Sequence, residues 1–230
     1  MGMKGKVALG AVVGVVVIGV VSANAGGNGG DGGSGSSGKG SSASAEHRAA
    51  GKKGSGTSEA AEKKKAAFDG DGDFQVGSDI KPGTYRTTGN TNDMCYWERA
   101  KNASGDTDSL LANDNVSGTS YVTVKATDKI FKSSGCKDWE AVDAKAQGSP
   151  ATKMAGNGGM FRVGVDIAPG TYKSTGNKDD MCYWERTKDA EHGLDSILAN
   201  DNVTGTAVVT ISAKDAYFKT TGCKDWKKTG

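Results

Sequence analysis

The chain has 230 residues, including 36 glycines and four cysteines, and its formal net charge is +2. This is not the strongly basic balance of a nucleic-acid-binding protein, so no nucleic-acid partner is expected. The glycine content is about twice the average for proteins and concentrates in one stretch, so the chain has to be interpreted segment by segment.

The N-terminus has the features of an export signal. Lys4 and Lys6 precede an uncharged, valine-rich run at residues 7–21, and residues 22–25 (SANA) supply small side chains for cleavage after Ala25. Such a pattern is typical of a secretory signal peptide. Residues 1–25 are therefore expected to be either a cleaved signal or an N-terminal membrane anchor that inserts through residues 7–21, and length alone does not decide between them. Both alternatives place the rest of the chain outside the cytosol.

A stalk is expected at residues 26–68. Its first part is a Gly/Ser-rich coil that cannot bury a core, which predicts disorder. Residues 1–68 carry nine Lys and Arg against four Asp and Glu, a net charge of +5, whereas the remaining residues carry −3. The basic arm suggests contact with an anionic surface such as cell-wall polymer or lipid headgroups, although its charge can also serve solubility alone.

An internal duplication dominates the rest of the sequence. Residues 74–139 align without a gap with residues 161–226, at an offset of 87, and roughly two-thirds of the aligned positions are identical. Two copies predict two domains rather than a solenoid. We refer to residues 69–139 as repeat 1 and to residues 161–230 as repeat 2, and we expect residues 140–160 to be a linker.

Each repeat holds two cysteines, 41 positions apart in both cases: Cys95 and Cys136, then Cys182 and Cys223. An aligned copy of 66 residues buries too little surface to be comfortably stable alone. Pairing within each repeat is the arrangement that lets both copies fold identically, and it would contribute about 4 kcal/mol by loop closure. Because neither copy has a CxxC motif or a shared histidine, no metal ion or other cofactor is expected.

Turn and strand signals alternate along each repeat. Residues 80–84 (IKPGT) and 167–171 (IAPGT) have the composition of type II turns. The expected strands of repeat 1 lie at residues 84–88, 94–99, 120–125 and 130–134. The predicted fold class is all-β, with two small disulfide-bonded antiparallel β-sandwich or barrel domains in tandem behind a disordered N-terminal stalk.

Strand alternation assigns faces to the side chains. Cys95, Trp97 and Arg99 should share the inner face of their strand, with Tyr96 on the opposite face. Tyr121 aligns with Val208, a difference that suits an exposed position. Residues 111–116 (LANDNV), repeated at 198–203, should form a turn, or else a cluster of oxygen acceptors for a calcium ion or sugar hydroxyls. The candidate ligand-binding residues are Tyr96, Asn113, Asp114 and Asn115 of repeat 1, and Tyr183, Asn200, Asp201 and Asn202 of repeat 2.

The combination of CYWER, LANDN and GCKDW in both copies resembles tandem Cys/Trp β-repeats of uncharacterised exported proteins of actinobacteria and their phages. The resemblance covers both repeats but not the stalk. It implies an exported, cell-envelope protein and brings no activity or site residue with it.

Catalysis is not expected. His47 lies in the stalk, and His192 aligns with Gly105, so neither histidine can serve a mechanism shared by the repeats, and both are expected at the surface. Carboxylates are plentiful but have no specific catalytic spacing. No catalytic residue is therefore assigned, and the chain is expected not to be an enzyme.

Two functions remain at this stage. The first is a non-catalytic pair of binding modules at the cell surface, for a glycan, cell-wall polymer or protein ligand, with avidity gained from two copies. The second is a secreted inhibitor or effector that acts on a foreign enzyme through the loops that differ most between the copies, residues 101–107 and 188–194.

Overall fold

The structure is a computed structural model that describes residues 66–230. These residues belong to one compact unit, Ser58–Gly230, which contains both repeats. The signal or anchor predicted at residues 1–25 and nearly all of the predicted stalk lie outside the described residues. Within residues 66–230, no helix has the length and apolar character needed to cross a membrane.

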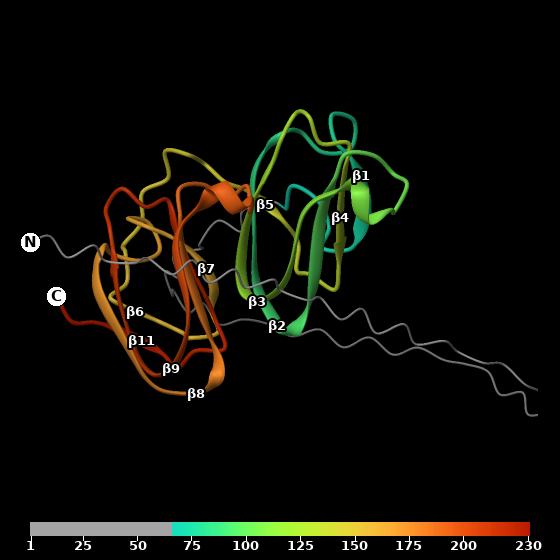
Figure 1. The fold of residues 1–230 in the computed structure, drawn as a ribbon. Coiled ribbons are helices and arrows are strands. Elements are labelled where there is room, and N and C mark those ends of the chain that lie inside the picture. The colour runs from blue at the N-terminus through green and yellow to red at the C-terminus, as the bar shows by residue number, and fades with distance from the viewer. Residues whose placement is uncertain (1–65) are drawn as a thin grey trace, which may run out of the picture. The chain divides into compact units, whose positions relative to one another are not determined.

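Repeat 1 is built on one long hairpin (Figure 1). Strands β2 (Gly83–Ala100) and β3 (Leu110–Val124) pair antiparallel along most of their length, and a short 3-10 helix, η1 (Thr107–Ser109), precedes β3. Strand β4 (Ile130–Ser134) pairs with the second half of β2, and β1 (Gly72–Gln75) pairs with β4. Strand β5 (Glu140–Ala141) pairs with the first half of β2.

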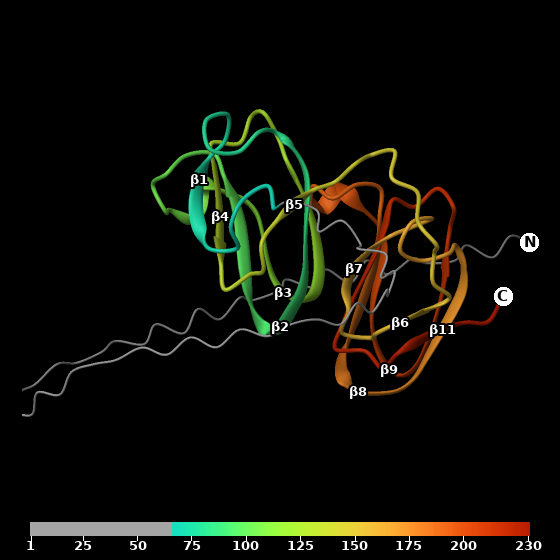
Figure 2. The same ribbon diagram turned by 180° about the vertical axis from the view of Figure 1, so that it is seen from behind.

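Repeat 2 reproduces this arrangement, as the view from behind shows (Figure 2). Its hairpin consists of β8 (Gly170–Thr187) and β9 (Ile197–Ile211), with η2 (Leu194–Ser196) before β9. The flanking strands are β7 (Gly159–Arg162), β10 (Tyr217–Thr221), β11 (Trp226–Lys228) and β6 (Lys153–Met154). Strand β10 lies between β7 and β8, and β11 lies between β8 and β6.

Each hairpin is bent, and the bend makes one sheet into a small sandwich. The β2–β3 register shifts on both sides of Asn90, so the two halves of β2 pair with different flanking strands, β5 and β4. Side chains from both halves meet in one buried cluster: Tyr85 and Val122 come from the first half, and Trp97 with Phe131 from the second. The all-β prediction is therefore confirmed, with the disulfide-bonded domain in two copies.

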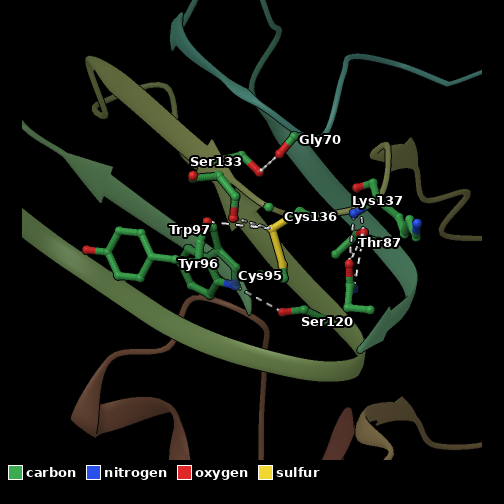
Figure 3. Close-up of a disulfide and its surroundings, with 12 residues drawn as sticks. Gly70, Thr87, Cys95, Tyr96, Trp97, Ser120, Ser133, Cys136 and Lys137 are labelled. Carbon is green, nitrogen blue, oxygen red and sulfur yellow. Dashed lines mark hydrogen bonds between the residues drawn. A yellow bond between two sulfur atoms is a disulfide. The ribbon is translucent and has the colours of Figure 1, made fainter. Parts of the chain in front are cut away.

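The disulfides lie at the same place in both repeats. Cys95 is bonded to Cys136, and Cys182 to Cys223. The Cys95–Cys136 bridge ties the chain after β4 to the middle of β2 (Figure 3). Beside it, Trp97 donates its indole N–H to Ser120 Oγ at 3.1 Å, so the bridge, the ring and the hairpin are packed together.

The segment expected to be a linker, residues 140–160, has strand pairing at both ends, because β5 begins it and β6 and the start of β7 lie in its second half. A single parallel pair, Thr119 with Gly159, also joins β3 to β7. The strands of the two repeats consequently form one continuous 11-stranded sheet.

Two expectations from strand patterning are wrong. Residues 111–116 do not form a turn but lie inside β3, where Ala112 and Val116 point to the core and pair opposite Arg99 and Cys95. Packing against the partner strand has overridden the turn preference of Asn and Asp. Tyr121 is not exposed: it retains 2% of its accessible surface, because repeat 2 covers it, whereas its counterpart Val208 retains 59%.

Candidate functional site

A polar cluster occupies the outward face of the repeat 1 hairpin. Tyr96 lies opposite Asn115, and Glu98 lies opposite Asn113, so these four side chains share one face. The Tyr96 hydroxyl donates to Glu98 Oε2 at 2.6 Å. Both residues are half-buried, whereas Asn113 and Asn115 are exposed. We call Tyr96, Glu98, Asn113 and Asn115 the outer cluster of repeat 1.

The tyrosine of this cluster stays protonated. Burial and the Glu98 carboxylate, which accepts its hydrogen bond, together raise the pKa of Tyr96 to about 12, while a hydrogen bond with Asn113 opposes the shift. A phenol with this pKa is a hydrogen-bond donor at neutral pH, not a general base. The cluster therefore contains uncharged groups that donate and accept hydrogen bonds, and a carboxylate that accepts them.

The same cluster in repeat 2 is more covered. Tyr183 donates to Glu185 Oε2 at 2.6 Å, and Asn200 Nδ2 donates to the Tyr183 hydroxyl at 3.3 Å. Glu185, however, is buried where Glu98 is half-buried. Burial and Glu185 raise the pKa of Tyr183, and the charge of Asp114, from repeat 1, adds to the shift.

Asp114 does not join the outer cluster, although the sequence groups it with Asn113 and Asn115. It lies on the other face of β3 and pairs opposite Trp97. There it forms an ion pair with Lys219 of repeat 2, at 2.8 Å, in which both side chains retain less than a fifth of their accessible surface. Its counterpart Asp201 is exposed.

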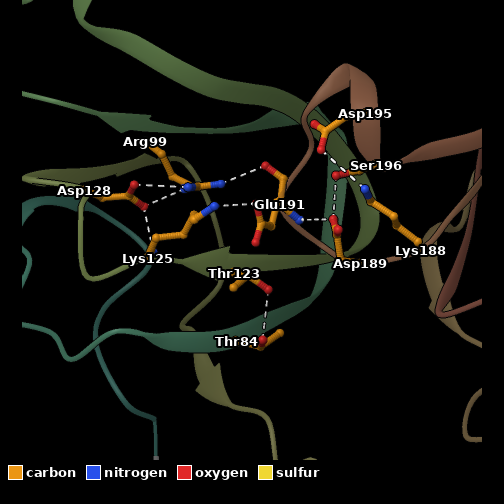
Figure 4. Close-up of polar contacts among 10 residues, drawn as sticks. All are labelled: Thr84, Arg99, Thr123, Lys125, Asp128, Lys188, Asp189, Glu191, Asp195 and Ser196. Carbon is orange, nitrogen blue, oxygen red and sulfur yellow. Dashed lines mark hydrogen bonds and ion pairs between the residues drawn. The ribbon is translucent and has the colours of Figure 1, made fainter.

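The loop at residues 188–194 connects repeat 2 to repeat 1. The imidazole of His192 packs edge-on against Trp97, with ring centroids 4.7 Å apart, and its Nε2 lies 2.7 Å from the Tyr121 carbonyl oxygen. Arg99 Nη1 donates to the Glu191 carbonyl at 2.7 Å (Figure 4). The Thr123 amide donates to the Ala190 carbonyl at 2.7 Å. His192 is therefore half-buried at an internal contact, and the prediction of a surface histidine is wrong for it.

Further contacts surround this loop. Lys125 and Glu191 form an ion pair at 2.7 Å, and the Tyr121 hydroxyl donates to Asp166 Oδ2 at 2.7 Å. Tyr121 also packs on Tyr217, with centroids 5.1 Å apart, in a buried cluster that includes Met160 and Ala190. Together these contacts join the repeats through apolar packing, hydrogen bonds and ion pairs.

The surroundings of His192 keep it neutral. Burial and the positive charge of Lys219 lower its pKa, while Asp114, the Tyr121 carbonyl and Glu185 oppose the shift. For Lys219 itself, burial lowers the pKa, but Asp114 and Glu185 outweigh it, so the net pKa is raised. A neutral imidazole beside an ammonium group avoids like-charge repulsion at this contact.

We call the residues that receive this loop the docking site: Trp97, Arg99, Tyr121 and Thr123 in repeat 1, and Trp184, Arg186, Val208 and Thr210 in repeat 2. In repeat 1 the site is filled, and Arg99 retains 4% of its side-chain surface. In repeat 2 no described residue fills it, and Arg186 retains 25%. Each repeat thus leaves a different surface open: the outer cluster in repeat 1 and the docking site in repeat 2.

Sequence reasoning missed the docking site, although a signal was present. Differences between the repeats fall where the repeats meet: repeat 2 has His192 where repeat 1 has Gly105, and repeat 1 has Tyr121 where repeat 2 has Val208. Met160, directly before repeat 2, likewise stands at the position of Asp73. A joint between two otherwise similar domains needs such asymmetry, because it uses a different face of each. In the part of the chain that the structure describes, no group of three His, Cys, Asp or Glu side chains is placed to hold a metal ion.

Each repeat is a small β-domain with one disulfide, and such domains belong to the class that folds outside the cytosol. A family profile described as "Rv1352-like extracellular domain" matches residues 66–140 and again residues 152–227. The chain therefore belongs to the Rv1352-like extracellular domain family, with two copies of the domain. The two matches contain the duplicated segments 74–139 and 161–226 and extend beyond both of them.

Similar proteins occur in mycobacteria. "Uncharacterized protein Rv1352" of Mycobacterium tuberculosis and "Uncharacterized protein Mb1387" of Mycobacterium bovis are each 31% identical over 82 residues, which cover 30% of this chain and 67% of theirs. This confirms the resemblance to uncharacterised exported proteins. No solved structure matches the chain.

Proposed function

We propose that this chain is an exported, non-catalytic binding protein of the cell envelope whose repeat 1 binds a hydroxyl-rich polymer, such as a glycan of the cell wall, through its outer cluster. The observation that carries the proposal is the Tyr96–Glu98–Asn113 arrangement on an open strand face. A phenol, a carboxylate and an amide offer both donors and acceptors to hydroxyl groups.

The chemistry of the cluster favours binding over catalysis. The raised pKa of Tyr96 keeps its proton in place, so the phenol takes part in hydrogen bonds and does not act as a base towards a substrate. An aromatic ring beside polar groups is also a common anchor at binding surfaces. The domain is extracellular, which gives it access to envelope polymers.

Packing between the repeats changes the expected role of the duplication. Because repeat 2 covers part of repeat 1 and its own cluster is partly buried, the two repeats are not identical, independent binding modules. We therefore attribute polymer binding to repeat 1, and the avidity expected from two flexibly linked copies is not part of the proposal.

The test is binding of the purified exported protein to isolated cell walls and to soluble glycans, measured by co-sedimentation and calorimetry. We expect Tyr96→Ala to weaken binding by about tenfold. Tyr183→Ala, the matched change in the more covered cluster, should weaken it far less. Equal effects of both changes, or no binding to any envelope polymer, would contradict the proposal.

The alternative, a secreted inhibitor or effector acting on a foreign enzyme, is favoured by one observation. Every residue of the loop at 101–107 is exposed, whereas the corresponding loop of repeat 2 is held against repeat 1. Inhibition would therefore act through repeat 1. Incubation with a panel of secreted proteases tests it, with a variant whose loop 102–106 is replaced by Gly and Ser as control.

A further inference from the structure

We propose that repeat 2 carries an open docking site for a surface loop of another protein, which it holds in the way that repeat 1 holds the loop at residues 188–194. The proposal goes beyond polymer binding by repeat 1 and uses a different surface. Its basis is the duplication, since the same site is present once with an occupant and once without one among the described residues.

The filled site defines how an occupant is held. Arg99 is fixed by Asp128, to which Nε and Nη2 donate at 2.6 and 3.1 Å, so that Nη1 points at the Glu191 carbonyl (Figure 4). The edge of β3 adds the Thr123 amide as donor to Ala190. Two fixed donors thus form hydrogen bonds with two successive carbonyl groups of the loop, so repeat 1 recognises the backbone of the loop at these positions.

A ring completes the contact. His192 packs on Trp97 and bonds the Tyr121 carbonyl through Nε2, so the residue after the two carbonyls supplies an aromatic side chain with a hydrogen-bond donor. The backbone of His192 has φ of 58°, which turns the loop so that the ring and the two carbonyls face the same side. The occupant is therefore a turn, not a straight strand.

Repeat 2 presents the same groups without an occupant. Arg186 is held by Asp215 through Nε and Nη2 at 2.6 and 2.9 Å, and its Nη1 donates to no described residue. Thr171 and Thr210 pair across the hairpin in the same register as Thr84 and Thr123, with hydroxyl oxygens 3.1 Å apart in repeat 2 and 2.9 Å apart in repeat 1. The Thr210 amide therefore points away from β8, as the Thr123 amide points away from β2. The edge of β9 is thus open where the edge of β3 is bonded.

Trp184 provides a further open donor. In repeat 1 the indole N–H of Trp97 is satisfied by Ser120, but Ala207 stands at that position in repeat 2, and no described residue accepts from Trp184. The ring itself is half-buried where Trp97 is fully buried. An occupant of repeat 2 therefore meets a half-buried aromatic ring and several donors, which favours a turn rich in carbonyl acceptors.

A second copy of the chain does not fit this site well. Its free loop at residues 101–107 has Gly105 where the ring of His192 is required, and Asp73 stands where Met160 joins the apolar contact. Its other loop, at 188–194, is already used within its own chain. The occupant we infer is thus a turn of a different protein, with a histidine or aromatic ring directly after two exposed carbonyls.

The experiment uses two cyclic peptides that the chain itself supplies. The first has the sequence of residues 188–196 (KDAEHGLDS), whose ends are adjacent because the Lys188 amide donates to the Ser196 carbonyl at 2.9 Å. The second has the sequence of residues 101–109 (KNASGDTDS), closed by the matching bond from Lys101 to Ser109 at 2.9 Å. Binding to the exported protein is measured by calorimetry.

We expect the first peptide to bind one site per chain, because the repeat 1 site is already occupied, and the second to bind at least tenfold more weakly. Trp184→Ala should weaken binding at least tenfold, and Thr210→Pro, which removes one edge donor at an edge-strand position that tolerates proline, should do the same. Leu198→Ala truncates an exposed side chain of β9 that is not part of the docking site and should leave binding unchanged.

Absence of binding by the first peptide, or equal binding by both peptides, would overturn the proposal. Association of chains that Trp184→Ala abolishes would identify a second copy as the occupant, and glycan binding lost in Trp184→Ala would identify a polymer; either result overturns it. Loss of polymer binding in Tyr96→Ala is read separately, so this proposal can fail while the proposed function stands, and the reverse.

Discussion

The contact between the repeats can be weakened at one residue, His192. Replacement by glycine restores the residue found at the aligned position of repeat 1, Gly105, which has the same left-handed backbone, with φ of 75° against 58°. Because glycine adopts this conformation freely, His192→Gly removes the side chain without adding backbone strain.

The expected loss follows from the two contacts of the ring. Edge-on packing against Trp97 contributes about 0.5–1.5 kcal/mol, and the hydrogen bond to the Tyr121 carbonyl about as much. Removing both should weaken docking of the loop by about 1–3 kcal/mol, which corresponds to roughly 5- to 150-fold in the equilibrium between docked and open states.

Amide hydrogen exchange at Thr123 reports this equilibrium, because its N–H is bonded to Ala190 only while the loop is docked. We predict exchange faster by the same factor in His192→Gly. Leu194→Ala, which truncates an exposed side chain of the neighbouring loop residue, should leave the rate unchanged. An unchanged rate in His192→Gly would refute the conclusion that the His192 side chain helps to hold the loop on repeat 1.

Three further predictions concern the ion pair, the disulfide and pH. Asp114→Asn leaves the partly buried Lys219 without its partner and should lower the free energy of unfolding by about 1–3 kcal/mol in urea titrations. Asp201→Asn, at the exposed counterpart, should change this free energy by less than about 0.5 kcal/mol. Equal effects of the two substitutions would contradict a role of the Asp114–Lys219 ion pair in stability. The double variant Cys95→Ala/Cys136→Ala should lose about 4 kcal/mol, and an unchanged urea midpoint would mean that the bridge does not support repeat 1. The pKa of His192 in the folded chain lies below its unfolded value of 6.5, so between these two pH values the unfolded chain binds more protons than the folded chain. The contribution of the neutral ring to the free energy of unfolding is therefore complete above pH 6.5 and is lost as pH falls through the folded pKa. Stability measured from pH 8 to pH 5 should therefore fall more steeply in the native chain than in His192→Gly, and parallel curves would exclude this role.

The fold was predictable from the sequence to the extent that each repeat folds by its own pattern. Equal cysteine spacing in a duplicated chain predicts bridges within each repeat, and alternation around Cys95 and Trp97 predicts which side chains enter the core. The strand at residues 111–116 could not be recognised from composition, because its two Asn side chains face outward, Asp114 is covered by the other repeat, and the pairing of the hairpin is set by distant residues.

The candidate site was predictable only in part. Tyr96 and Glu98 share a face, as period-2 alternation along one strand requires, but Asn113 and Asn115 join them only through the cross-strand register. Asp114 and Tyr121 were misplaced because their surroundings belong to the other repeat. A pattern within one repeat carries no information about which of its faces the second repeat covers.

The account depends on one asymmetry between the repeats, a filled docking site in repeat 1 and an open one in repeat 2. The most direct measurement is the attenuation of the tryptophan indole N–H signals in NMR spectra by a soluble paramagnetic agent. The account predicts strong attenuation of Trp184, protection of Trp97, and loss of that protection in His192→Gly. Equal protection or equal attenuation of the two indole groups in the native protein would contradict it.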